Sequence, residues 1–575
     1  MAVPTASRSV ILLCLLAAQP AFAQMDMSAH AMGTEKQVPP AELPAPRKMT
    51  GIGNLHMRIT ATPEAQMWFD QGLNLIHDFW DYESARAFEQ SVRVDPHCAI
   101  CYWGLFQAES FYHGLSQGYA APALARAVEL KGHASKRERM FIEAAATSES
   151  EPRTNKSGPP TDTSAEILRK LVKDDPKEIV ARLVLSQRVP QKERLEILDG
   201  ILKQDPQNSA ANHYYIHAVE AGPHPEQALH SAEVLASLAP NSGHMVHMPG
   251  HIFSRMGNYG RAEQAFAAAI AVDERYMAEQ HVSADNNWNY VHNLMYAIEN
   301  LMEEGKLAKA TALSAKLTGA RGELESTLYT YSSRDAVSRL DPRLPVALRT
   351  ADWKRALELV KSKVLPESLP NLQFLARQFE TFATGMHALE AGDTIAADTA
   401  SSKFDAELWR MSQMPAPIQK KAAPVSPPTL QIMPDADLSP LMSMLSIMSM
   451  ELRASLLAAQ GKVTDAHGVF TKAAQAEKAL GYREPPTYIR PVGETEGAAM
   501  LAANHWDDAR AAFEQALAER PRSGFALYGI ALSSEKSGHA AEAAKEYTDF
   551  LAAWKDADLT LPQIVHARAI ALPLR

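Results

Sequence analysis

The two stretches His213-Tyr-Tyr-Ile-His217-Ala-Val-Glu220 and His244-Met-Val-His247-Met-Pro-Gly-His251 decide the fold of this chain. His213 and His247 are 34 residues apart, and so are His217 and His251. This spacing is the period of a known two-helix repeat, in which equivalent residues of neighbouring units lie side by side. The period therefore predicts stacked helical repeats with imidazoles between neighbouring helices.

Small and aromatic residues recur in one frame along the chain. The first unit has Gly72, Ser84, Phe88 and Ser91, and Pro96 follows where its second helix should end. The frame recurs at Gly250, Tyr259, Ala262, Phe266 and Ala269, at Leu457, Ala466, Phe470 and Ala473, and at Gly497, Ala509, Phe513 and Ala516. This pattern resembles the tetratricopeptide repeat (TPR) family. The resemblance implies an all-α fold, a TPR-type α-solenoid of helix-turn-helix repeats.

Four longer motifs make the resemblance more specific. They are HYYIHAVEAGPHPEQAL from residue 213, GHMVHMPGHIFSRMGNYGRA from residue 243, DPHCAICYWG from residue 95 and YREPPTYIRPVGE from residue 482. They resemble a bacterial, exported subgroup of TPR proteins with "YIH" and "HMPxHI" motifs. This resemblance implies the fold and the location of a site, but it does not imply which reaction the protein catalyses.

Composition and charge narrow the classes of function. Of the 575 residues 46% are hydrophobic, and long runs rich in Ala, Leu, Glu and Lys favour helices over strands. The formal net charge is −10, and Lys and Arg are spread along the chain. Because a nucleic-acid-binding protein needs a basic patch, nucleic acid is excluded as a partner.

The first 23 residues are typical of a cleaved secretory signal. Arg8 provides the positive end, an apolar segment follows, and Ala21-Phe22-Ala23 forms an A-x-A cleavage site. We therefore expect a periplasmic or secreted protein. No later stretch approaches the roughly 18 consecutive apolar residues that a spanning helix needs, so no membrane span is predicted.

Proline-rich segments suggest the remaining boundaries. Residues 24–60 are expected to be a flexible leader. Soft ligands suited to copper occur near its start, namely Met25, Met27, His30 and Met32; the alternative is that this stretch is an ordinary disordered terminus of the mature chain. Residues 61–410 form the predicted N-terminal solenoid with the histidines. The segment 411–440 has seven prolines and is expected to link it to C-terminal repeats at 441–575. The methionines from Met442 to Met450 are predicted to be core residues, and copper ligation is the alternative.

Cys98 and Cys101 form a C-x-x-C pair. In an oxidising compartment such a pair favours a local disulfide, and a redox or metal role is the alternative. Residue 102 is Tyr, so the C-x-x-C-H pattern of covalent haem attachment is absent.

The histidines form a candidate metal site. Residues three or four apart share a helix face, so His213, His217 and Glu220 project together. The predicted metal ligands are His213, His217, Glu220, His244, His247, His251 and His292, whereas His224, His230 and His281 fall outside the repeat positions. The TPR resemblance implies that these positions line the concave groove. A set dominated by imidazole suits copper or zinc.

Three hypotheses for function follow. The first is a solenoid that binds one or two copper or zinc ions, as a possible metal-dependent oxidoreductase or hydrolase with Glu220 as base or ligand and Tyr214 close by. The second is a metal-free scaffold that binds a protein or peptide in the groove. The third is copper handling without catalysis. Pro249-Gly250 predicts that the helix kinks or begins between His247 and His251.

Overall fold

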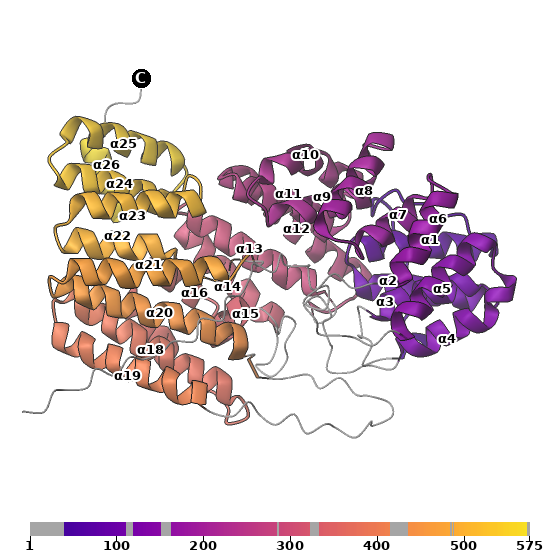
Figure 1. Ribbon diagram of the computed structural model, residues 1–575, viewed down its shortest axis with the longest axis horizontal. Helices are drawn as coiled ribbons and strands as arrows, with labels where there is room; N and C mark the ends of the chain where they lie inside the picture. Colours follow the sequence, from indigo (N-terminus) through magenta and orange to yellow (C-terminus); the bar gives the residue numbers. More distant parts are fainter. Residues whose placement is uncertain are drawn as a thin grey trace, which may run out of the picture.

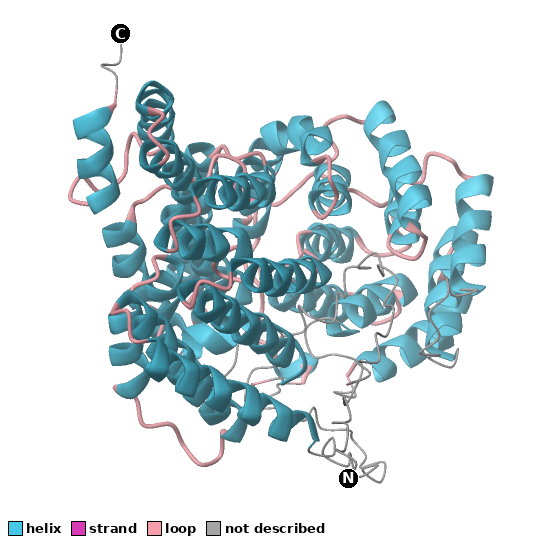
Figure 2. Cartoon of the chain, turned by 60° about the vertical axis from the view of Figure 1, so that its left-hand side comes forward, coloured by secondary structure: helices cyan, strands magenta, loops and turns pink. Residues whose placement is uncertain are grey.

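The structure is a computed structural model that describes residues 39–110, 119–150, 163–284, 287–321, 333–413, 435–436, 438–482, 486 and 488–571. Within these residues the regular elements are helices and there is no strand (Figures 1 and 2). The predicted signal at 1–23, the Met/His segment at 25–32 and most of the proline-rich segment lie outside the described residues.

The helices before residue 305 build the part of the chain with the histidines. They are α1 (Pro63–His77), α2 (Asp81–Val94), α3 (Ala99–Glu109), α4 (Ala120–Leu130), α5 (Lys136–Ser150), α6 (Thr163–Asp174), α7 (Ile179–Ser186), α8 (Gln191–Gln204), α9 (Ser209–Glu220), α10 (Leu229–Leu238), α11 (Gly243–Arg255), α12 (Tyr259–Gln280) and α13 (Trp288–Glu303), with short 3-10 helices at Pro40–Glu42, Lys131–His133 and Pro225–Ala228.

The later helices continue the stack. They are α14 (Leu307–Arg321), α15 (Ser333–Leu340), α16 (Leu344–Arg349), α17 (Trp353–Lys361), α18 (Pro370–Glu390), α19 (Thr394–Gln413), α20 (Leu438–Ala459), α21 (Val463–Ala479), α22 (Val492–Ala502), α23 (Trp506–Glu519), α24 (Gly524–Lys536), α25 (Ala540–Ala553) and α26 (Pro562–Ile570).

Glycine and phenylalanine at fixed positions hold the helix pairs together. A Cβ on Gly72 of α1 would lie 2.9 Å from the ring of Phe88 on α2, so only glycine allows this close approach. The same contact recurs sixteen residues apart in two other units, at Gly250 with Phe266 and at Gly497 with Phe513. The repeat frame read from the sequence therefore corresponds to a repeated helix-packing contact, as expected for an α-solenoid.

The segment 39–60 packs against the first repeat. Leu43 and Met57 are buried, and the side chain of Asn74 exchanges hydrogen bonds of 2.8 and 2.9 Å with the backbone N–H and carbonyl of Leu55. The guanidinium of Arg86 donates to the carbonyl of Pro44 over 3.0 Å. The expectation of a flexible leader through residue 60 is therefore wrong for this part, because its apolar side chains belong to the core.

The first repeat also contacts helices that lie 200 residues later. The indole N–H of Trp288 donates to the carbonyl of Phe79 over 3.2 Å, and the hydroxyl of Tyr276 donates to the Glu83 carboxylate over 2.6 Å. In Figure 1, α1 and α2 lie beside the stack that contains α9 and α12. The turn between α1 and α2 is thereby brought onto the helices that carry the histidines.

The C-terminal repeats return to the end of α13. The indole N–H of Trp554 donates to the carbonyl of Glu303 over 2.7 Å, and the backbone N–H of Asp558 donates to the carbonyl of Gly305 over 3.1 Å. These contacts join residues more than 250 positions apart, so both ends of the solenoid are held against α13.

The hydrophobic core does not divide at the proline-rich segment. One cluster of buried side chains runs from Leu43 to Ala320 with Val346, and a second runs from Ala336 to Ile530. The second cluster includes α18 and α19 before the segment and α20 after it. One core therefore includes helices on both sides of residues 411–440, the segment expected to link an N-terminal solenoid to C-terminal repeats.

Helix α20 is long and apolar. Its part Leu441–Ala459 is long and apolar enough to cross a membrane by length and composition alone, whereas no membrane span was predicted from the sequence. Of this window 67% is buried inside the protein, where Leu445 and Leu452 are covered completely. Its methionines Met444 and Met448 lie in the same core, which fits the packing role expected for them.

A buried carboxyl on α20 makes stability depend on pH. Burial raises the pKa of Glu451 from 4.5 to about 8, although hydrogen bonds from Tyr488 and Thr495 oppose the rise. Because the folded pKa lies above the unfolded one, this contribution to stability is complete below pH 4.5 and is lost as the pH rises through 8. A Glu451→Gln variant does not titrate there. Its free energy of unfolding relative to wild type should rise by about 1.4 kcal/mol per pH unit between about pH 5 and 8.

Chemical unfolding at several pH values in this interval checks the prediction. The matched control is Glu390→Gln, whose side chain is 54% exposed. A difference between Glu451→Gln and wild type that does not change with pH would contradict the prediction.

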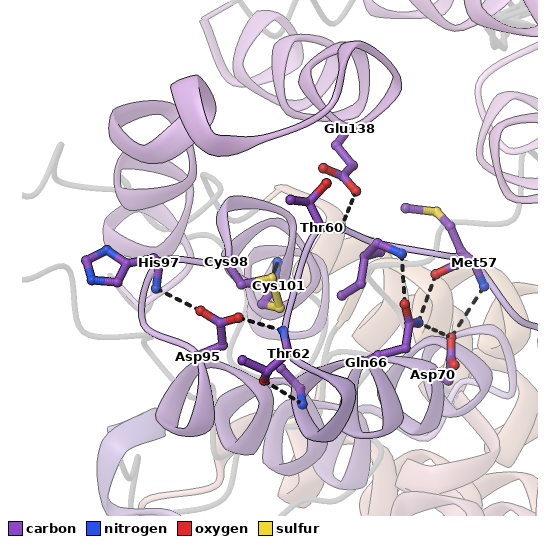
Figure 3. The surroundings of a disulfide bond; sticks show 12 residues. Met57, Thr60, Thr62, Gln66, Asp70, Asp95, His97, Cys98, Cys101 and Glu138 are labelled. Atoms are coloured by element: carbon purple, nitrogen blue, oxygen red, sulfur yellow. Dashed lines mark hydrogen bonds between the residues drawn. A yellow bond between two sulfur atoms is a disulfide. The ribbon is translucent and has the colours of Figure 1, made fainter.

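Cys98 and Cys101 form a disulfide at the start of α3, with their Cα atoms 5.3 Å apart. Figure 3 shows the carboxylate of Asp95 beside it, accepting from the backbone N–H groups of Thr62 and His97. Both sulfur-bearing residues are buried. The expected disulfide is confirmed, and the bonded pair offers no thiolate to a metal.

Candidate metal centre

Six buried histidines meet on three helices. α9 carries His213 and His217, α11 carries His244, His247 and His251, and α13 carries His292. Helix α11 contacts both α9 and α13, so the three histidine-bearing faces converge. None of the six residues is more than 8% exposed. The TPR resemblance implied that they line a concave groove; instead they are buried, and the turn between α1 and α2 covers three of them, His213, His217 and His244.

The six imidazoles form two sets of three. Triad 1 is His213, His217 and His244, and triad 2 is His247, His251 and His292. Within each triad, one ring nitrogen per residue lies within 4.8 Å of the other two. The triads adjoin each other, since the ring centroids of His244 and His247 are 5.9 Å apart. Two ions could therefore be held in one chamber.

Hydrogen bonds fix the proton positions in triad 1. The Nδ1–H of His213 donates to the carbonyl of His77 over 2.6 Å. The Nδ1–H of His244 donates to the Oδ1 of Asn289 over 3.2 Å, and the Nδ2 of Asn289 donates in turn to the carboxylate of Asp273. Both histidines therefore present an unprotonated Nε2, as metal-ligating histidines do. These two Nε2 atoms are buried and have no hydrogen-bond partner.

Glu220 connects the two triads. One carboxylate oxygen accepts the Nδ1–H of His217 over 2.6 Å, and the other accepts the Nδ1–H of His251 over 2.5 Å. This leaves the Nε2 of both histidines as the side that can face a metal. Glu220 was predicted as a ligand or base, whereas both of its oxygens are already used to orient imidazoles.

Triad 2 has the closest nitrogen pair. The Nε2 atoms of His247 and His251 are 2.5 Å apart. Because the Nδ1 of His251 donates to Glu220, its Nε2 accepts and the Nε2 of His247 carries the shared proton. The rings of His292 and Tyr296 lie 4.7 and 5.0 Å from the ring of His247.

Burial keeps three of the six imidazoles neutral. It lowers the pKa of His213, His244 and His247 well below 6.5, and the neighbouring imidazoles lower it further. The pKa of His77 is lowered to about 4, also by burial. Neutral imidazole is the form that binds metal, so the chamber is prepared for a cation near neutral pH.

Phe79 covers triad 1 from the turn between α1 and α2. Its ring centroid lies 4.7 Å from that of His213, 5.3 Å from that of His217 and 5.5 Å from that of His244. Its φ is 57°, in the left-handed region that a bulky residue rarely adopts. The fold therefore accepts local backbone strain to place this ring on the three imidazoles.

The other predicted residues lie as follows. The hydroxyl of Tyr214 is 2.7 Å from the Nδ1 of His77, and burial raises its pKa. Tyr214 therefore lies behind triad 1 and bonds to a histidine outside both triads. The three histidines set aside from the sequence, His224, His230 and His281, are exposed and belong to neither triad.

Helix α11 runs through the Pro249-Gly250 step. It begins at Gly243, where the Ser242 side chain caps it, so the prediction that a helix could begin at this step is wrong. A Cβ at Gly250 would lie 2.3 Å from the Phe266 ring. Close packing against α12 therefore explains this glycine.

Sequence reasoning missed four residues of the centre. Phe79 gave no signal, because the fold brings it to the histidines from 134 residues away. Asp273 and Asn289 act through His244, and their roles depend on the contact between α12 and α13. Tyr296 could have been found, since it lies four residues after His292 and shares its helix face.

A cavity of about 340 Å³ reaches triad 2 from the other side. His251 and Tyr296 form part of its wall, together with Arg255 on α11, Glu299 on α13 and Arg520 after α23. Tyr482 and Tyr488, which follow α21, also line it. The cavity thus lies between the histidine-bearing helices and the C-terminal repeats.

Comparison with solved structures returns helical proteins of similar length. A human IFIT1 dimer with m7Gppp-AAAA has 11% identity and a TM-score of 0.33, covering 80% of this chain and 90% of that one. Yeast Tom70 has 10% identity and a TM-score of 0.30, covering 88% and 94%. The APC/C hetero-tetramer Cut9-Hcn1 has 12% identity and a TM-score of 0.26, covering 88% and 96%. No protein-family model and no curated protein matches the sequence.

The fold is a TPR-like helical solenoid. This statement depends on the chain's own repeated glycine and phenylalanine contacts and on its consecutive helix pairs. The likeness to these structures concerns the fold alone.

Proposed function

We propose that this protein is an exported metalloprotein that binds two transition-metal ions, copper or zinc, one in each triad. The observation that carries the proposal is the pair of buried Nε2 atoms of His213 and His244, which have no partner while their Nδ1 atoms are fixed by oxygen acceptors. A buried polar atom without a partner is costly, and a metal ion would satisfy both nitrogens at once.

The ligand chemistry supports copper or zinc. Three imidazoles per ion is a set that both metals accept, and a three-histidine site leaves a fourth position for water or another ligand. In triad 2 the residues that would hold an ion are His247, His251 and His292, and binding would release the proton shared by His247 and His251 to solvent. An ion with an open position supplies Lewis-acid or redox chemistry, which is the basis for a metal-dependent oxidoreductase or hydrolase.

The two other hypotheses have less support. A metal-free groove for peptides requires an accessible concave face at the histidines, whereas the Phe79 turn covers triad 1. Copper handling without catalysis stays a prediction, because its ligands Met25, Met27, His30 and Met32 lie outside the described part of the chain. Export and membership of the bacterial "YIH" subgroup also stay predictions.

Metal content of the purified full chain tests the proposal. The protein is stripped with a chelator, reloaded separately with copper and with zinc, and analysed for bound metal. Wild type should retain two ions per chain, and a His213→Ala/His247→Ala variant should lose nearly all of them, because each triad then keeps only two ligands.

A His224→Ala/His230→Ala variant is the matched control, since it removes two exposed histidines from the same region. Circular dichroism shows whether the helices of both variants persist. Wild type that retains no more copper or zinc than the His213→Ala/His247→Ala variant would overturn the proposal.

A further inference from the structure

The two triads differ in what surrounds them. Triad 1 is enclosed by rings: Phe79 contacts all three of its histidines, and the Trp288 ring lies 5.5 Å from that of His244. The Trp288 indole N–H also donates a hydrogen bond to the Phe79 carbonyl. No member of triad 1 lines the cavity described above. An ion in triad 1 would therefore not be reached from this cavity.

Triad 2 meets the cavity at His251. Behind His251 the Glu220 carboxylate holds its Nδ1, so the ring is fixed at the cavity wall. The Tyr296 ring is stacked on His251 with centroids 4.6 Å apart and lines the same wall. The cavity of about 340 Å³ has room for a small ligand, and it adjoins triad 2 at the buried side chain of His251.

A positively charged side chain lies one helical turn from His251. Arg255 follows His251 by four residues on α11 and lines the cavity. Its guanidinium donates to the carbonyls of Glu220 and Gly222 and lies 5.5 Å from the centre of the Tyr482 ring. Among the described residues no carboxylate forms an ion pair with it, so its charge is available to an anion in the cavity.

Four glutamates line the cavity: Arg520 pairs with Glu299 and Glu303, whereas Glu477 and Glu519 lie across it on α21 and α23. Arg520 forms ion pairs with Glu299 over 2.8 Å and with Glu303 over 2.5 Å. Glu477, on α21 across the cavity, accepts from the backbone N–H of Val492. The side of the cavity next to His251 is therefore the side that favours negative charge.

We infer that the ion in triad 2 keeps an open coordination position and takes a small anionic ligand with an oxygen or nitrogen donor, held between the ion and Arg255. The ion in triad 1 is closed and takes none. This inference rests on the proposed metal binding and adds which ion reacts with molecules from outside.

Azide binding to metal-loaded full-length protein tests the assignment. Azide is titrated into Cu(II)-loaded protein and, in parallel, into Co(II)-loaded protein, and the absorption bands of the metal are followed. We expect one azide per chain. His213→Ala should retain one ion and still bind azide, and His292→Ala should lose azide binding, because it weakens only triad 2.

Arg255→Gln examines the anion subsite. It should keep the metal content of wild type and weaken azide binding about tenfold, since a charged hydrogen-bond donor next to the anion is lost. Arg261→Gln is the matched control, because Arg261 lies on α12 outside the cavity wall and is paired with Glu233.

Metal analysis of the same samples separates the two possible failures. Wild type without bound metal overturns the proposed function. Wild type with two ions that binds no azide, or azide binding that is lost in His213→Ala and kept in His292→Ala, overturns only the assignment of the open ion. Equal azide affinity in Arg255→Gln and Arg261→Gln overturns the anion subsite.

Discussion

Replacement of Arg349 by Ala should lower the free energy of unfolding by about 3–5 kcal/mol, the loss expected when one partner of a buried ion pair is removed. Arg349 is 1% exposed. Its guanidinium bonds to Glu303 over 2.8 and 3.0 Å, to Glu494 over 2.5 and 3.0 Å and to Ser523 over 3.2 Å. The variant would leave Glu494 buried without its main counter-charge.

The charge balance around Glu303 shows what the arginines contribute. Burial alone would raise the pKa of Glu303, yet Arg349 and Arg520 hold it at about 2. Because the folded pKa lies below the ordinary value, this contribution to stability is present above pH 4.5 and is lost as the pH falls through about 2. The destabilisation by Arg349→Ala should therefore be full at neutral pH.

Thermal or denaturant unfolding with a helical signal measures the effect. Arg343→Ala is the control, because Arg343 is 44% exposed and paired with Asp341 at the surface, where such pairs contribute at most about 1 kcal/mol. If Arg349→Ala unfolds at the same denaturant concentration as Arg343→Ala, the network adds nothing to stability.

Replacement of Glu220 by Gln should lower the affinity for one of the two bound ions by about 10- to 100-fold and leave the affinity for the other unchanged. The carboxylate accepts an Nδ1–H from His217 and another from His251. A Gln amide offers one acceptor and one donor, so it can serve only one of these histidines in the same way. The other must move its proton to Nε2, which then cannot bind a metal.

Glu220→Ala should lower the affinity for both ions, because it removes both hydrogen-bond acceptors. Competition with a chelator of known affinity resolves the two dissociation steps in each variant. The control is Glu226→Gln, whose side chain is 54% exposed and lies 3.1 Å from the Nδ1 of His224, outside both triads. Release of both ions at the wild-type chelator concentration by Glu220→Gln would show that the carboxylate does not position the ligands.

The repeat architecture was predictable because it depends on local spacing. Gly72 and Phe88 carry a steric requirement that recurs in other units, and a sequence pattern can record it. The segment 39–60 was wrongly expected to be flexible, since prolines and polar residues concealed the burial of Leu43 and Met57. The core shared by α18, α19 and α20 could not be predicted from the proline-rich segment, because proline excludes helix locally and does not indicate which core lies on either side.

The candidate centre was partly predictable. The 34-residue period brought His213 and His217 next to His247 and His251, and the structure places them together. Division into two triads was not predictable, because it depends on how far α9, α11 and α13 are rotated. Closure of the chamber was not predictable either, since it needs contact between Phe79 and residues more than 130 positions away.

The position of the Phe79 turn determines the order in which the centre can be assembled. A linear solenoid forms from contacts between neighbours, so any run of repeats can fold by itself. Here the His213 acceptor and the cover of triad 1 come from residues 77–79, whereas the last ligand is His292. The chamber is complete only after this long loop of chain has closed, which is a slow step in folding. An ion that arrives earlier would meet two imidazoles on α9, three on α11 and one on α13, and later closure of the Phe79 turn would cover an ion in triad 1.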